Sequence, residues 1–238
     1  FNYADVAGIW DQWRNKFHSN SDGLTKKSIM YWAKQDADPN AYKEIRENTV
    51  DYFMNEAIDS QTEFDLASVL YQLFKDRFIC ISISKNIWYE FRDHRWVEND
   101  SGNSLRMAIS KDLHALFTKK TIITVSEMNS YQADDPRWAK TQTKAHKLAS
   151  LALRLKKTTD KNNIMRESKE LFYDESFLEE QDNNPYLLGF ANGIYDFKEN
   201  VFRPGRPEDY VVKSTNIDYI PIEKANKKYV KEITEFME

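Results

Sequence analysis

The sequence predicts an α+β fold, in which a helical N-terminal module is followed by a mixed domain with β-hairpins and several helices. Apolar residues recur at helical spacing in 42–58 and 63–77, whereas 78–97 alternates in β-branched and aromatic letters. The 238 residues, 41% of them hydrophobic, can bury a core as one large domain or two small ones.

Three helices are expected before the first strand. The first covers 24–35 and stops at Asp38-Pro39, because proline disfavours a helical conformation in the residue before it. The second covers 42–58, and the third covers 63–77 with the same apolar spacing.

A β-hairpin and two further helices follow. The strands are expected at 78–84 and 87–91, with a turn near Lys85-Asn86 and a third strand at 95–97. Residues 103–117 and 136–155 then read as helices, the second with Pro136 in its first turn, where its missing N–H costs nothing.

The C-terminal part alternates short strands with turns. Asn192-Gly193 is a tight-turn signal. Strands are expected at 193–197 and 209–213, joined by a stiff loop at 203–207, and a charged helix at 224–238. The boundaries predicted from these patterns give a helical module at 1–60, a mixed domain at 61–222 and the start of a new helix at 223–238.

Composition restricts the compartment. The lone Cys80 excludes an intramolecular disulfide and suits a reducing environment. No run of about eighteen apolar residues predicts a membrane span. The first ten residues have no secretory pattern, so a cytoplasmic, non-secreted protein without membrane partners is expected. The missing initiator Met suggests a fragment of a longer chain.

Charge is distributed unevenly along the chain. The net charge is -4, but 140–169 contains nine basic residues against two acids. Six acids and no Lys or Arg then occupy 170–182. A basic helix therefore precedes an acidic stretch, and it is the main candidate for contact with a polyanion.

The basic residues predict a nucleic-acid site. If four to six of them neutralise phosphates of single-stranded DNA, the logarithm of affinity falls with that of salt concentration with a slope of roughly -3 to -4. The alternative is that their methylene stems cover the edges of the core while their charged ends stay hydrated. The candidate nucleic-acid-binding residues are Lys140, Lys144, Lys147, Arg154, Lys156, Lys157, Arg203 and Arg206.

Aromatic residues offer a second interpretation of the hairpin. Trp88, Tyr89 and Trp96 can stack on bases, since aromatic platforms bind single strands without sequence preference. Core packing is the favoured interpretation, because Trp and Tyr also dominate protein cores. Trp10, Trp13 and Trp32 are expected to pack the opening helices.

No catalytic or metal site is predicted. Asp36 and Asp38 have the spacing of a two-metal carboxylate pair, but a helix cap before Pro39 is favoured. Asp134-Asp135 before Pro136 is likewise expected to cap a helix. The four histidines show no ligand spacing, and Cys80 in an apolar strand is expected to be inert. No phosphate-binding loop is present, so no ATP hydrolysis is expected from this stretch.

The stretch 184–219 carries a family resemblance. It combines the Asn192-Gly193 turn, the Tyr195-Asp196 pair, and Pro204-Gly205-Arg206-Pro207-Glu208-Asp209-Tyr210 followed by Lys213-Ser214-Thr215. This string resembles the end of the connecting domain of poxvirus-type and phage/plasmid-type primase-helicases of large DNA viruses and mobile elements. Residues 78–97 resemble that domain's opening hairpin, and 24–40 resembles the helical module that closes the primase half.

The resemblance implies a function in DNA replication. Residues 1–60 would end the primase C-terminal module, 61–222 would form the connecting or collar domain, and 223–238 would lead toward a hexameric superfamily 3 helicase. The whole protein would use ATP and magnesium, whereas this region would hold no cofactor. It would bind single-stranded DNA, contact other replication proteins and aid self-association into a hexamer.

Two alternatives remain open from the sequence. One is an oligomerisation or protein-interaction module of the replisome without DNA contact of its own. The other is a metal-dependent enzyme that uses Asp36 and Asp38.

Overall fold

The computed structural model describes residues 38–237 and confirms the α+β fold. The chain divides into two compact units, 1–49 and 50–238, with the border inside α3 (Pro39–Ser60). The predicted helix at 24–35, the tryptophans at 10, 13 and 32, and Asp36 lie outside the described residues. The predicted domain boundaries at 60 and 222 stay predictions.

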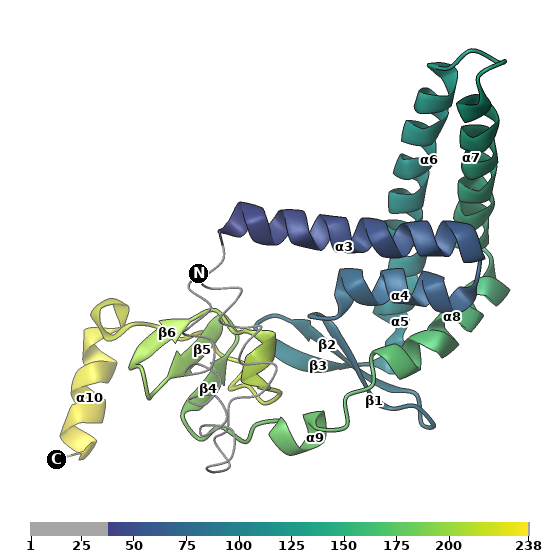
Figure 1. Cartoon of the computed structure of the whole chain (residues 1–238). Helices are drawn as coiled ribbons and strands as arrows, with labels where there is room; N and C mark the ends of the chain where they lie inside the picture. Colours follow the sequence, from purple (N-terminus) through teal and green to yellow (C-terminus); the bar gives the residue numbers. More distant parts are fainter. Residues whose placement is uncertain (1–37, 238) are drawn as a thin grey trace, which may run out of the picture. The chain divides into compact units, whose positions relative to one another are not determined.

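The larger unit contains a helical core (Figure 1). Helix α4 (Glu63–Phe74) precedes the first sheet. After that sheet, α5 (Asn103–Ala108), a π-helical turn (Ile109–Leu113) and α6 (His114–Asn129) form a continuous helical run. The chain then reverses into α7 (Pro136–Arg154), so that α6 and α7 lie side by side as a hairpin, and α8 (Thr158–Leu171) packs against α4.

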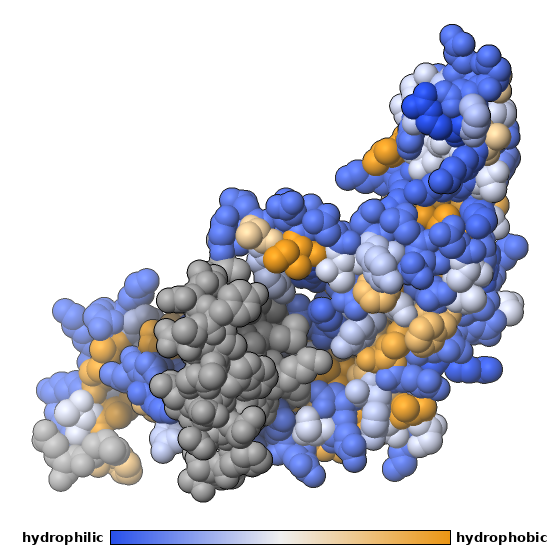
Figure 2. Space-filling model, in the orientation of Figure 1, coloured by the Kyte–Doolittle hydropathy of each residue, from blue (hydrophilic) through white to orange (hydrophobic). Residues whose placement is uncertain are grey.

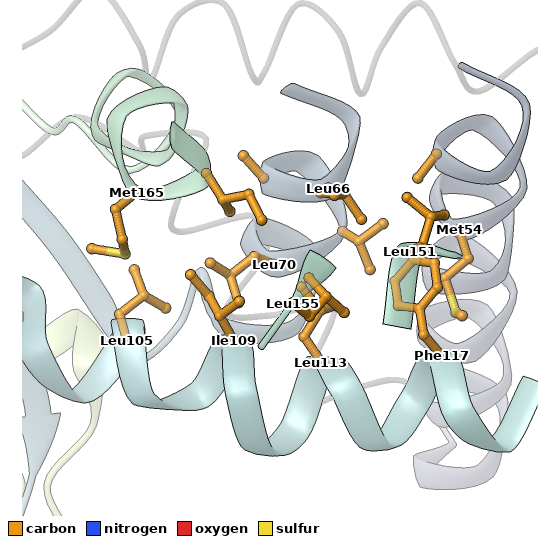
Figure 3. Close-up of a cluster of buried hydrophobic side chains, with 14 of the residues drawn as sticks. Met54, Leu66, Leu70, Leu105, Ile109, Leu113, Phe117, Leu151, Leu155 and Met165 are labelled. Carbon is orange, nitrogen blue, oxygen red and sulfur yellow. The ribbon is translucent and has the colours of Figure 1, made fainter. Parts of the chain in front are cut away.

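Buried aliphatic side chains hold these helices together. Each helix contributes residues at helical spacing, so one stripe of each faces the others. In Figure 3 the side chains from α3, α4, the α5–α6 run, α7 and α8 converge on one another. Among the fully or almost fully buried members are Met54, Leu66, Leu70, Leu105, Ile109, Leu113, Phe117, Leu151, Leu155 and Met165.

The helix predicted at 103–117 is longer than expected and contains the π turn. It continues to Asn129, beyond the residues with buried apolar spacing, and Ile122 and Ile123 are exposed in this extension. A π turn leaves backbone carbonyls without their ordinary helical partners. The carbonyl of Ser110 accepts from Lys156 Nζ at 2.5 Å, and Ser110 Oγ donates to the carbonyl of Leu155 at 3.1 Å.

The first sheet is antiparallel, in the order β1 (Phe78–Ser82), β2 (Ile87–Arg92), β3 (Arg95–Asn99). These bounds confirm the predicted hairpin and its third strand. Phe78, Cys80 and Trp88 join the helical core, whereas Ile79 and Trp96 pack with Phe177 of α9 (Phe177–Glu180). One face of the sheet therefore packs on the helical core, and the other face packs on a separate apolar cluster around Phe177.

A buried carboxylate is satisfied within this sheet. Glu90, only 3% exposed, accepts from Arg77 Nη2 at 2.6 Å and from Asn99 Nδ2 at 2.9 Å. A buried charge is tolerated only when it is paired and hydrogen-bonded, and Glu90 meets both conditions.

The second sheet is antiparallel, in the order β4 (Leu187–Phe190), β5 (Gly193–Asp196), β6 (Val201–Arg203). The strand predicted at 193–197 is confirmed to within one residue. Backbone bonds from Thr215 N to the Gly189 carbonyl (2.9 Å) and from Ala191 N to the Ile217 carbonyl (2.8 Å) cover the free edge of β4.

The strand predicted at 209–213 is wrong. Residues 207–209 form a 3₁₀ turn, and Tyr210 follows with φ 52°, which is incompatible with a strand. The backbone N–H groups of Val212 and Lys213 donate to the Asp182 carboxylate at 2.8 and 3.0 Å, so they are satisfied without a neighbouring strand.

This irregular segment joins the two sheets. The backbone N–H of Trp96 in β3 donates to the Val211 carbonyl, and its indole Nε1 donates to the Pro207 carbonyl, both at 2.8 Å. Gly205 lies against the β2–β3 turn, where a Cβ would stand 2.0 Å from the His94 carbonyl oxygen. Only glycine permits this approach without displacement of the backbone.

The chain ends in α10 (Lys227–Met237), which confirms the charged helix predicted from 224. Tyr229, Ile233 and Phe236 lie on one side of it at helical spacing and are exposed. Among the described residues, none of the helices is long and apolar enough to cross a membrane.

Candidate nucleic-acid interface

Helix α7 carries three of the predicted lysines on one face. Asp135 caps the helix by accepting from Arg137 N at 2.8 Å, and Pro136 occupies its first turn. The buried stripe of α7 starts at Ala145 and contains Ala145, Leu148 and Leu151. Positions 140, 144 and 147 follow the i, i+4, i+7 pattern, which keeps their side chains together beside that stripe.

These lysines line a hollow between α7 and the C-terminal half of α3. Its volume is about 380 Å³, and it is lined by Asn55, Ile58, Asp59, Lys140, Thr143, Lys144 and Lys147. Asp59 is the one carboxylate in this lining. The hollow therefore presents three ammonium groups against one acid.

The three lysines differ in their partners. Lys147 Nζ lies 3.6 Å from Asp59 Oδ1 and 3.4 Å from the Asp59 carbonyl oxygen. Lys140 and Lys144 are exposed, and within residues 38–237 neither ammonium group has a hydrogen bond or ion pair. Two ammonium groups thus remain available for an anion, while Lys147 is held at the wall.

An amide group adds polarity to the same wall. Asn55 donates from Nδ2 to Asp51 Oδ2 at 3.3 Å, whereas its buried Oδ1 atom has no hydrogen-bond partner in the described part of the chain. A buried acceptor without a donor costs about 1–3 kcal/mol. A donor entering the hollow, such as a lysine ammonium or a bound water, would relieve this cost.

The surroundings of the hollow are hydrophilic. In Figure 2 the outer part of the α6–α7 hairpin is predominantly blue, with few apolar residues on the visible face. The tip is fixed by Arg137, whose guanidinium binds the Asp135 carboxylate at 2.6 Å and lies 4.6 Å from the centre of the Tyr131 ring. These interactions order the start of α7 beside the lysines.

Arg154, at the other end of α7, is engaged inside the fold. Its Nη2 lies 2.5 Å from Glu63 Oε1, its Nε lies 2.9 Å from Asp160 Oδ1, and its Nη1 donates to the Gln61 carbonyl. Its side chain is 19% exposed. The guanidinium ties the starts of α4 and α8 to the end of α7, so little of it faces solvent.

Lys156 and Lys157 follow α7 and differ in the contacts of their ammonium groups. Lys156 supports the π turn through Ser110, as described above. Lys157 is exposed, and the described residues provide no hydrogen bond or ion pair for its ammonium. Lys157 lies outside the lining of the hollow.

Arg203 belongs to a buried ion cluster in the second sheet. Its guanidinium contacts Asp209 Oδ1 at 2.8 Å and Asp196 Oδ2 at 3.2 Å, and its side chain is 15% exposed. Hydrogen bonds to Asp209 raise the pKa of Arg203 above its usual value, although burial acts in the opposite direction. Arg206 lies in the same loop, where its backbone N–H donates to Asp209 at 2.7 Å.

The structure therefore brings three of the eight candidates together. Lys140, Lys144 and Lys147 share the hollow, whereas Arg154, Lys156 and Arg203 are bound to partners within the fold. Asp160 is near Arg154 in the sequence, and Asp209 is near Arg203. This short spacing is the sequence signal for the two ion pairs. The contribution of Asn55 and Asp59 is not predictable, because nothing in the sequence shows that α3 faces α7.

The tryptophans of the first sheet confirm the core interpretation. Trp88 is fully buried and Trp96 is 2% exposed, so neither can stack on a base. Trp88 packs against Phe172, and Trp96 packs against Phe177.

The remaining candidates have local structural contacts. Asp38 accepts from Asn40 N at 3.1 Å, which confirms the predicted cap at the start of α3. Burial raises the pKa of the Cys80 thiol and therefore disfavours the reactive thiolate. Among the described residues, no group of three or more His, Cys, Asp and Glu side chains is arranged to hold a metal.

The fold defines an α+β module, in which two small antiparallel sheets are joined to a helical core. The family description "D5 N terminal like" matches residues 67–238, and the chain belongs to this family.

Relatives from large DNA viruses are similar to the chain. It is 31% identical over 217 residues to "Putative helicase L207/L206" of Acanthamoeba polyphaga mimivirus, covering 91% of this chain and 22% of that protein. It is 29% identical over 253 residues to "Putative helicase 022R" of Frog virus 3, covering 93% and 25%. It is 25% identical over 240 residues to "Putative primase C962R" of African swine fever virus (Pig/Kenya/KEN-50/1950), covering 90% and 24%.

These matches confirm the resemblance to primase-helicases of large DNA viruses. The chain spans about a quarter or less of the length of each of these relatives.

Proposed function

We propose that this region binds single-stranded DNA within a viral primase-helicase that acts in DNA replication. The lysine-lined hollow, formed by Lys140, Lys144 and Lys147 between α3 and α7, is the contact surface. The names of the relatives, which include helicases and primases, support the replication context.

One observation carries the proposal. Lys140 and Lys144 lie one helical turn apart, are exposed, and have no carboxylate partner among the described residues, whereas other cations of the basic segment are bound internally. Ammonium groups bind phosphates as point charges without a fixed orientation. Such a surface suits a flexible single strand and gives binding without preference for a base sequence.

Within the whole primase-helicase, this DNA contact would serve a larger role. By holding the strand, the region would couple primase to a hexameric superfamily 3 helicase and aid hexamer assembly. ATP and magnesium would act elsewhere in the whole protein. Other replication proteins would be its further partners, in the cytoplasm or at a viral replication site.

A second candidate function is protein interaction without DNA contact. The exposed apolar residues of α10, Tyr229, Ile233 and Phe236, favour it, because helices often use such i, i+4, i+7 anchors to bind an apolar groove. A module of this kind would form oligomers or bind a replication protein and would ignore oligonucleotides.

The test compares a charge-reversal variant with a matched control. The double variant Lys140→Glu/Lys144→Glu should bind a fluorescent single-stranded oligonucleotide at least tenfold more weakly than the wild type at low salt. Lys85→Glu, which reverses an exposed lysine in the β1–β2 turn, should bind normally. Equal binding by all three proteins would contradict the site, and no binding by the wild type would favour protein interaction.

A further inference from the structure

We propose that the aromatic face of the second sheet stacks on the bases of single-stranded DNA. This inference rests on the proposed function for the identity of the ligand, but it concerns a different surface and a different interaction. The lysine hollow would hold phosphates, whereas this sheet would hold bases.

The sheet has two chemically different faces. Strand register places Leu188, Tyr195 and Phe202 in one row across β4, β5 and β6. Because side chains alternate along a strand, Phe190 shares this face. Tyr186 and Phe197 extend it beyond the strand ends, where the Phe197 N–H donates to the Tyr186 carbonyl at 2.8 Å.

The opposite face carries the buried and charged groups. Ile194 is fully buried, and Asp196 pairs in register with Leu187 of β4 and Val201 of β6 on that face. Arg203 forms ion pairs with both Asp196 and Asp209 there. The aromatic face consequently receives no charged side chain from the strands.

The aromatic rings form a connected and partly exposed group. The rings of Phe202 and Tyr219 are stacked, with centroids 4.5 Å apart and planes at 20°. The centroid of the Tyr195 ring lies 5.0 Å from that of Phe197 and 5.4 Å from that of Tyr219. Phe197 is 55% exposed and Tyr186 is 54% exposed, so two large rings at one end of the face are open to solvent.

Hydrogen bonds fix this face before any ligand arrives. The Tyr195 hydroxyl donates to Asn200 Oδ1 at 2.6 Å. Asn192 donates to the Tyr219 carbonyl at 3.2 Å and accepts from the Tyr219 N–H at 2.9 Å. A pre-ordered aromatic surface loses little conformational freedom on binding, which favours recognition by stacking.

The charges near this face permit a nucleic acid as the occupant. The acid of β5 points to the other face and is paired with Arg203, so it does not repel a phosphate backbone on this side. Lys198, beside Phe197, is exposed, and its ammonium has no partner among the described residues, so it can approach a phosphate while the ring takes the base. Sheets with exposed aromatic rings are a recurring solution for binding unstacked bases.

The test separates bases from phosphates. The double variant Tyr186→Ala/Phe197→Ala removes the two open rings, and Val201→Ala is the matched control, since it truncates an exposed side chain on the other face of the same sheet. Each protein is titrated with an oligothymidine and with an abasic strand of equal length. Circular dichroism checks that the variants are folded.

The wild type and Val201→Ala should bind the oligothymidine more tightly than the abasic strand. The ring variant should lose about 5- to 100-fold in affinity for the oligothymidine and nothing for the abasic strand. Unchanged oligothymidine binding by the folded ring variant would overturn the inference, including the case in which the variant loses self-association instead.

Failure of the proposed function gives a different result. If the lysine hollow is not a DNA site, the Lys140→Glu/Lys144→Glu variant binds both strands like the wild type. If only the stacking inference fails, the lysine variant binds weakly, whereas the wild type and the ring variant bind both strands equally.

Discussion

Arg154 and Glu63 form an ion pair of 2.5 Å between the end of α7 and the start of α4, with both side chains partly shielded from solvent. The same guanidinium also reaches Asp160 at the start of α8. This cation stabilises a junction of three helices. Lys140 and Lys144, on the same helix, have no such partner among the described residues.

Arg154→Met should lower the free energy of unfolding by about 1–3 kcal/mol, because it leaves Glu63 and Asp160 without their shared partner in a partly buried site. Urea unfolding followed by circular dichroism measures this change. Lys157→Met, which removes an exposed charge three residues later, should unfold like the wild type. Equal stability of the two variants would contradict the junction role.

Gly205→Ala should destabilise the connection between the two sheets. The new methyl group would stand 2.0 Å from the His94 carbonyl oxygen, and the backbone must shift to relieve the overlap. We expect a loss of about 1–3 kcal/mol in the free energy of unfolding and a lower Tm. Pro204→Ala, at the exposed neighbouring position, is the control, and a wild-type Tm for Gly205→Ala would disprove the close approach.

Acid should destabilise the ion cluster of the second sheet. Burial acts to raise the pKa of Asp196, but N–H donors from Glu199 and Lys198 and the Arg203 guanidinium outweigh it, so the pKa is lowered. A carboxyl whose folded pKa is depressed contributes stability above its unfolded value, about 3.9, and that stability is lost as the pH falls through the folded pKa.

Asp196→Asn should therefore be less stable than the wild type at pH 7, and the difference should shrink below about pH 4. Thermal unfolding at pH 7, 5, 4 and 3 measures it. A difference that stays constant across this range would show that the carboxylate charge does not matter.

Cys80 should resist thiol reagents in the folded protein. Its side chain is buried, and burial raises its pKa, so both access and thiolate formation are unfavourable. Ellman's reagent should react with one thiol in urea and with almost none in native buffer over the same minutes. Rapid reaction under native conditions would place the thiol at the surface.

Much of the fold follows from local patterns. The hairpin at 78–92 and the helix from Pro136 are predicted because alternation, helical spacing and the Asp-Pro start are properties of neighbouring residues. The strand expected at 209–213 fails because a distant carboxylate, Asp182, satisfies its backbone donors. Long-range contacts of this kind leave no local signal.

The candidate site shows the same division. The lysines of α7 are visible as a basic segment, but which of them are paired depends on residues far along the chain, such as Glu63 and Asp59. The aromatic face of the second sheet is not predictable from the sequence, because local patterns do not indicate β4 and β6 as strands and give no strand register.

The salt dependence of single-stranded DNA binding tests the central claim most directly. Each lysine that neutralises a phosphate should contribute about 0.7 to the slope of log affinity against log salt concentration. The Lys140→Glu/Lys144→Glu variant should therefore show a slope shallower than the wild type by about 1.4, whereas Lys85→Glu should match the wild type. Identical slopes for all three proteins would contradict DNA binding by the lysine hollow.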